Sequence, residues 1–176
     1  YMYFFSYRIV GFLKHYLIAV LIWMVLRLGF YLTNAASFDL SEHGLWYFIF
    51  HGLRYDIAAI CAINALMVVG YLLPIRMSKA YATIMTGIFT VTNGTAILLE
   101  LADWSYFPYN HKRSTFDVFT LVGNGADFAN QLPTFFRNYW YLFCIALLLL
   151  ALLWWMSYQI NMRLMDKEKT YSISYK

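Results

Sequence analysis

The residues of this sequence best suited to chemistry are five charged side chains set within strongly apolar segments. They come from three separate stretches of the chain, which contribute Arg27, then Arg54 and Asp56, then Glu100 and Asp103. Arginine donates paired hydrogen bonds to phosphate, and carboxylates accept hydrogen bonds from hydroxyl or ammonium groups. Brought together, these residues would form a pocket for the polar head group of a lipid.

The same five residues allow two other interpretations. In the first, they pair only with one another, for example Arg27 with Glu100 and Arg54 with Asp103, and fix the packing of the helices that carry them. In the second, they belong to a pathway for protons or ions, which is less favoured because few ionisable residues continue toward the other side of the membrane. The sequence leaves the pocket and the structural ion network equally open.

The composition places the chain in a membrane. Hydrophobic residues make up 62% of it, charged residues only 12%, and the mean hydropathy is +0.56, whereas about 25% of a soluble domain is charged. This excludes a disordered chain, an ordinary cytosolic enzyme and a nucleic-acid-binding protein, so no nucleic acid is expected as a partner. Cys61 and Cys144 lie in apolar runs, and we expect both to be small buried hydrophobic residues.

Four segments are long enough to cross a bilayer as helices, since a span needs about 20 apolar residues. They cover approximately residues 12–32, 45–73, 80–102 and 139–158. The second stops before Pro74 and is too long for an upright span, so we expect it to tilt, or to begin as an interfacial turn around Gly44 that bends near Gly52. Asn64 and Asn93 extend the polar faces of the second and third spans, which predicts that these faces hydrogen-bond across the bundle. The predicted fold class is all-α: one polytopic membrane helix bundle over residues 1–176, with about four transmembrane helices.

The basic residues outside the spans are divided unevenly between the two sides. If both ends of the chain are cytoplasmic, eight basic residues lie at the inner side: Arg8, Lys14, Arg76, Lys79, Arg163, Lys167, Lys169 and Lys176. Three lie at the outer side: Lys112, Arg113 and Arg137. Because basic residues accumulate in cytoplasmic loops, we predict that both ends are cytoplasmic and that residues 33–44 and 103–138 are outside.

The second outer segment is expected to contain short interfacial helices. Its phenylalanines recur among polar residues, and breaks are predicted at residues 123–125 and at Pro133. His43, His51 and His111 also fall on the outer side, but their spacing fits no metal-ligand motif, so no metal site is expected. The sequence contains no nucleophile elbow, HExxH motif or phosphate loop, and this segment by itself is not expected to be catalytic.

Two stretches resemble a known family. Residues 52–60, GLRYDIAAI, followed by Asn64, resemble the second span of the lipoteichoic acid synthase family. Residues 103–119, DWSYFPYNHKRSTFDVF, are similar to the outer segment that follows the third span of that family. The resemblance covers most of residues 45–119 and is closest to the Bacteroidetes-type members, which are described as sulfatase or phosphoglycerol transferase proteins.

This resemblance implies a membrane bundle joined to a large extracytoplasmic domain of the alkaline phosphatase superfamily. That domain would carry a nucleophilic threonine and a divalent metal, usually manganese, and would transfer glycerol phosphate or hydrolyse phosphate or sulfate esters. No catalytic residue can be carried over to this chain, which holds no counterpart of them. Because the family commonly has five spans, we expect a piece of a longer protein of the bacterial cytoplasmic membrane, ending before a fifth span.

Together, the charges and the resemblance give a candidate site for an anionic phospholipid head group. The candidate residues are Arg54, Asp56, Glu100, Asp103, Tyr106, His111, Lys112 and Arg113. The basic side chains would contact phosphate, the carboxylates would orient them or bind hydroxyls, and Arg27 is assigned to structural ion pairing. The expected function is membrane anchoring and head-group presentation for a transferase or hydrolase. The alternatives are a transporter or channel subunit and a purely structural anchor.

Overall fold

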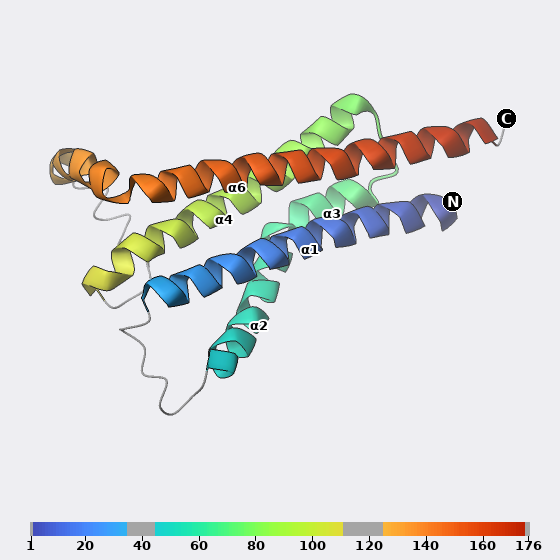
Figure 1. The fold of residues 1–176 in the computed structure, drawn as a ribbon. Helices are drawn as coiled ribbons and strands as arrows, with labels where there is room; N and C mark the ends of the chain where they lie inside the picture. Colours follow the sequence, from blue (N-terminus) through green and yellow to red (C-terminus); the bar gives the residue numbers. More distant parts are fainter. Residues whose placement is uncertain (1, 35–44, 111–124, 175–176) are drawn as a thin grey trace.

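The structure is a computed structural model that describes residues 2–34, 45–110 and 125–174 (Figure 1). The helices are α1 (Met2–Thr33), α2 (Leu45–Ile63), α3 (Ala65–Leu72), α4 (Lys79–Asn110) and α6 (Gly125–Ser174). Residues 73–78 join α3 to α4, and the described ranges contain no β-strand. The predicted all-α fold class is therefore confirmed.

Three helical stretches are long and apolar enough to cross a membrane: Ser6–Thr33, Lys79–Phe107 and Arg137–Thr170. A fourth is obtained if Phe50–Ile63 and Ala65–Leu72 are counted as one span that bends by 51°. The chain is therefore a helix bundle in which three or four helical stretches are apolar enough to span a membrane, depending on how the bent α2–α3 pair is counted. The helices also run further than predicted, α4 beyond residue 102 and α6 beyond residue 158.

The bundle is apolar outside and carries polar groups inside. Leu17 and Val25 of α1 are 57% and 66% exposed, whereas Arg8 is 1% exposed. This arrangement suits a hydrocarbon solvent, in which a polar side chain is stable only against protein partners. Cys61 and Cys144 are exposed, so the prediction that they are buried is wrong. A thiol behaves as a small hydrophobic group, which lipid tails accommodate as well as a protein core does.

The bend between α2 and α3 lies at Asn64, and the prediction of a bend near Gly52 is wrong. Asn64 has φ −91° and ψ 7°. Its side-chain amide donates to the carbonyl oxygen of Ile60 at 2.9 Å, and its backbone N–H bonds the same oxygen at 3.0 Å. An asparagine that bonds back to the preceding turn competes with the regular helix ladder and bends it. The backbone N–H of Val68 reaches the carbonyl of Asn64 at 3.0 Å, so the ladder resumes directly after the bend.

The side chain of Asn64 also crosses to α4 and forms a reciprocal amide pair with Asn93. Nδ2 of Asn93 donates to Oδ1 of Asn64 at 2.8 Å, and Nδ2 of Asn64 donates to Oδ1 of Asn93 at 3.2 Å. Both side chains are buried. The prediction that the polar faces of the second and third spans hydrogen-bond across the bundle is confirmed at this pair.

The helix ahead of the last span differs from the prediction at Pro133. Pro133 lies inside α6 without ending it, and the residue with non-helical torsion angles is Tyr139, at φ −120° and ψ 23°. Figure 1 shows the first residues of α6 turned away from its long axis. A short helix thus precedes the span over residues 125–138, with its break at Tyr139. The remaining outer residues of the prediction, 111–124, lie outside the described ranges.

Asn64→Leu and Asn93→Leu should each lower the free energy of unfolding, because each leaves the partner amide buried without its cross-helix bond. We expect a loss of about 1–3 kcal/mol for each variant. The double variant should lose less than the sum, with a coupling of about 0.5–2 kcal/mol, since it removes both amides together. Unfolding in mixed micelles of rising dodecyl sulfate content, followed by circular dichroism, measures these values. Thr95→Val, at an exposed position of α4, is the control, and strictly additive losses would contradict the pair.

Candidate functional site

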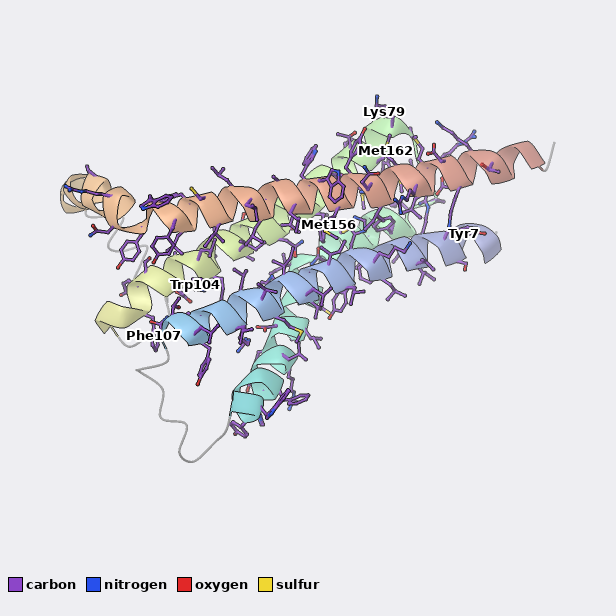
Figure 2. All side chains as sticks on the ribbon, viewed as in Figure 1. Tyr7, Lys79, Trp104, Phe107, Met156 and Met162 are labelled. Carbon is purple, nitrogen blue, oxygen red and sulfur yellow. The ribbon has the colours of Figure 1, made fainter. Side chains whose placement is uncertain are left out.

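The two ends of the bundle can be told apart by their residues. Figure 2 shows Trp104 and Phe107 near one end, and Tyr7 and Lys79 toward the other. We name these the outer end and the inner end, after the orientation that the basic residues predict. The candidate head-group residues belong to the outer end.

An ion pair joins α1 to α2 in the outer half of the bundle. Nε of Arg27 donates to Oδ2 of Asp56 at 2.8 Å, and Nη2 of Arg27 donates to Oδ1. The two side chains are 13% and 7% exposed, so the pair is largely shielded. The two planar groups meet through two parallel hydrogen bonds, a geometry that fixes orientation as well as distance. This contact, rather than the considered pairing of Arg27 with Glu100, holds α1 against α2.

Gly52 provides the space for this ion pair. A Cβ atom on Gly52 would lie 1.8 Å from Nη1 of Arg27, far closer than any real contact. Gly52 precedes Asp56 by one helical turn, so both residues share one face of α2. The bare backbone at Gly52 accepts the guanidinium, and the carboxylate one turn later binds it. The glycine that the sequence suggested as a bend is therefore a packing position.

Arg54 lies on the opposite side of α2 from Asp56. It is exposed whereas Asp56 is buried, because residues two apart on an α-helix point in nearly opposite directions. Arg54 has no hydrogen-bond or ion-pair partner within the described part of the chain. The considered pairing of Arg54 with Asp103 is therefore wrong, and Arg54 and Asp56 do not line one pocket.

Exposed aromatic side chains flank Arg54 along the outer half of α2. Trp46, Phe50 and Tyr55 are 72%, 63% and 74% exposed. Aromatic residues of this kind, tryptophan and tyrosine above all, are enriched where hydrocarbon meets head groups. A long arginine side chain can extend its charged end to that boundary while its stem stays in the apolar layer. Arg54 is thus exposed on the outside of the bundle, among aromatic side chains.

The candidate residues on α4 lie further inside the protein. Asp103 is 7% exposed, and Glu100 and Tyr106 are half-buried. Phe107, one residue past Tyr106, packs edge-to-face on Phe30 of α1, with 5.1 Å between ring centroids. Asp103, Tyr106 and Phe107 stand on the part of α4 that runs past residue 102, where the sequence predicts the end of the span. The remaining candidates, His111, Lys112 and Arg113, lie outside the described residues.

The inner half of the bundle holds a polar cluster that the sequence analysis missed. The His15 ring nitrogen Nε2 lies 2.9 Å from Oγ of Ser157, and Nδ2 of Asn161 donates to Oγ1 of Thr86 at 2.9 Å. The Tyr71 hydroxyl donates to Oδ1 of Asn161. The five side chains are buried and come from α1, α3, α4 and α6. Ser157 and Asn161 are one helical turn apart, and this spacing could have indicated a polar face on the last helix. The predicted span, however, ended at residue 158.

A second ion pair closes the inner end. Nε of Arg8 donates to Oε1 of Glu168 at 2.8 Å, and Nη1 of Arg8 donates to the carbonyl oxygen of Leu73 at 2.6 Å. Oε2 of Glu168 accepts the backbone N–H of Met77 at 2.8 Å. The pair joins α1 to α6 and also binds backbone groups of the α3–α4 connection. From the sequence, Arg8 is expected only as one of the inner-side cations. The available signal was Pro74, which ends α3 and leaves carbonyl groups that need donors.

The buried charges of these two pairs are neutralised locally instead of surrounding one reacting centre. Arg27 with Asp56 and Arg8 with Glu168 stand in opposite halves of the bundle. Within residues 2–34, 45–110 and 125–174, no group of three histidine, cysteine or acidic residues could hold a metal ion. The geometry therefore shows paired charges inside the described bundle and an exposed Arg54 on its surface.

The chain matches no protein-family model, no curated protein and no solved structure. The expected resemblance to the lipoteichoic acid synthase family stays a prediction, which rests on residues 52–60 and 103–119. The first of these runs contains Gly52, Arg54 and Asp56, which the structure places at the outer ion pair and on the exposed face beside it.

Arg27→Met should destabilise the bundle by about 3–5 kcal/mol, because it leaves the Asp56 carboxylate buried without its cation. The double variant Arg27→Met and Asp56→Leu should recover much of that loss, since no unpaired charge then remains. Arg54→Met, which removes an exposed arginine from the same region of the bundle, should change stability by less than about 0.5 kcal/mol. Dodecyl sulfate unfolding measures all three. Equal losses for the two arginine variants would contradict the packing role of the ion pair.

Proposed function

We propose that this chain is the membrane-anchoring domain of a phosphoglycerol transferase or sulfatase-like enzyme, and that its outer end presents a lipid head group to the catalytic part. The observation that carries this proposal is Arg54, which is exposed, has no partner within the described residues, and stands among exposed aromatic side chains. Behind it, the ion pair of Arg27 with Asp56 holds α2 in place. A guanidinium on a helix that is held in place would bind each lipid head group in the same geometry.

A phosphodiester is the head-group chemistry that Arg54 fits. A guanidinium offers two parallel N–H donors to a pair of phosphate oxygens. The half-buried Glu100 and Tyr106 would bond the hydroxyl groups of a glycerol-type head group, and Lys112 and Arg113 would add positive charge at the outer segment. The buried Asp56 and Asp103 would act by positioning their neighbours, because their burial removes them from direct contact with a lipid.

The proposal also assigns a location and a partner. The domain would lie in a bacterial cytoplasmic membrane with both described ends at the cytoplasmic side, as the excess of inner basic residues favours. An extracytoplasmic catalytic domain, with the manganese that the resemblance implies for it, would meet the outer end. This would bring the head group held at Arg54 next to the catalytic centre.

A transporter or channel subunit is the second candidate, favoured by the bent α2–α3 pair. Transporters bind ions and substrates where a helix is interrupted and backbone groups are left free. At this bend, however, the side chain and the backbone N–H of Asn64 both bond the carbonyl of Ile60. The interior amides also bond one another across helices, which is what an anchor needs. The anchoring function therefore has more support than the transporter. A purely structural anchor, which binds no head group, would be the simplest form of that function.

In the full-length protein, Arg54→Gln should lower turnover of a phospholipid substrate by about ten- to a hundredfold. This is the loss expected from one charge-assisted hydrogen bond, about 1.5–3 kcal/mol. Hydrolysis of a soluble phosphate ester should stay unchanged, because that substrate would enter the catalytic domain from water and would not need Arg54 to hold it at the membrane. Steady-state rates on the two substrates, measured side by side in detergent and in vesicles, test the difference.

Arg137→Gln is the matched control, since Arg137 is an exposed arginine at the start of the last span. It should leave both rates unchanged. Equal losses on both substrates for Arg54→Gln, or no loss with the fold intact, would rule out the head-group role. Ion flux through vesicles containing the protein, abolished by Asn64→Leu, would favour the transporter instead.

A further inference from the structure

A cavity of about 310 Å³ opens between α1 and α6 at the inner end of the bundle. Its lining includes Tyr7, Val10 and Lys14 from α1 and Arg163, Leu164 and Lys167 from α6. These positions recur at spacings of three and four residues, so each set occupies one face of its helix. Tyr7 lies far from Trp104 and Phe107, so this cavity is separate from the outer site (Figure 2).

The floor of the cavity is apolar and formed by a close approach of the two helices. A Cβ atom on Gly11 would lie 2.4 Å from Cδ1 of Leu164, so the glycine allows α6 to approach α1 here. Leu164 is 7% exposed, whereas Val10 at the rim is 44% exposed. The cavity therefore offers a hydrocarbon surface that continues outward along α1.

The rim of the cavity carries three cations that no described carboxylate neutralises. Lys14, Arg163 and Lys167 are exposed, and no carboxylate belongs to the described lining. Within the described chain, Lys14 and Arg163 have no hydrogen-bond or ion-pair partner. Nζ of Lys167 lies 5.0 Å from the ring centroid of Tyr7, a cation–π contact that leaves its charge in place. The nearby Glu168 is already bound by Arg8 and by the backbone of Met77.

We propose that this cavity is a binding site for an anionic phospholipid. The phosphate would lie among Lys14, Arg163 and Lys167, and one acyl chain would follow the apolar surface from Leu164 past Val10. Basic pockets between helices at the cytoplasmic side are a recurrent way to hold anionic lipids. A free inorganic anion would use the three cations but would leave the apolar floor unexplained, so the lipid accounts for both halves of the site. The inference does not depend on the function proposed for the outer end.

The test compares two triple variants that remove the same charges. The cavity variant is Lys14→Gln, Arg163→Gln and Lys167→Gln, and the control is Arg76→Gln, Lys79→Gln and Lys169→Gln, three exposed inner-end positions outside the cavity lining. Each protein is placed in nanodiscs of phosphatidylcholine with a minority of phosphatidylglycerol. Electron paramagnetic resonance of spin-labelled lipids then gives the preference of the protein for phosphatidylglycerol over phosphatidylcholine. The cavity variant should lose this preference by at least about fivefold, the effect of a single cation near a membrane, and the control should retain it.

A second pair of variants fills the cavity without changing charge. Val10→Trp should abolish the preference for phosphatidylglycerol, whereas Ile9→Trp, at an exposed neighbouring position outside the lining, should not. Circular dichroism and size-exclusion profiles verify that each variant is folded. Equal losses in the two triple variants would mean that surface charge alone attracts the lipid and would overturn the site. Displacement of the labelled lipid by inorganic phosphate, but not by chloride at equal ionic strength, would show a free-anion site and would also overturn the proposal.

Discussion

Hydrocarbon offers no hydrogen bonds, and this constraint governs the bundle: a polar group inside must find its partner in the protein. Three contacts along the bundle satisfy this constraint. They are the ion pair of Arg27 with Asp56, the amide pair of Asn64 with Asn93, and the ion pair of Arg8 with Glu168. Each contact joins two different helices, so satisfying a buried group also sets the packing of a helix pair. Apolar contacts cannot do this alone, because lipid tails are as good a partner for leucine as another helix is.

The bend at Asn64 follows from the same constraint. Its side chain bonds back to Ile60 and across to Asn93, so one residue both interrupts the helix and anchors the interruption. The interior then continues through Tyr71, Asn161 and His15 to the inner ion pair, with a partner at each of these side chains. Within the described residues, these side chains link α1, α3, α4 and α6 through hydrogen bonds in the interior of the bundle.

The two ends of the bundle differ from its interior in how they use charge. Inside, each arginine of an ion pair is matched by a carboxylate; at the surface, Arg54 on α2 and Lys14 and Arg163 at the inner end have no such match within the described residues. Burial explains the contrast, because an unpaired charge is costly in hydrocarbon and inexpensive where head groups and water reach it. Charges left free at the boundary are therefore the ones available for phosphate, at the outer end in the proposed anchoring function and at the inner end in the cavity between α1 and α6.

The helical class follows from the sequence alone, because long apolar runs admit few other structures in a bilayer. The sequence also indicated that Asn64 faces Asn93, since helical periodicity places polar residues on one stripe. Which charges meet depends on the packing of the helices. Arg27 pairs with Asp56 where Gly52 leaves room for a guanidinium. Arg8 is buried where the carbonyl groups of Leu73 and Ile75, on either side of Pro74, accept its hydrogen bonds. These contacts depend on where one helix lies against another, and periodicity along a single helix carries no information about the distance to its neighbour.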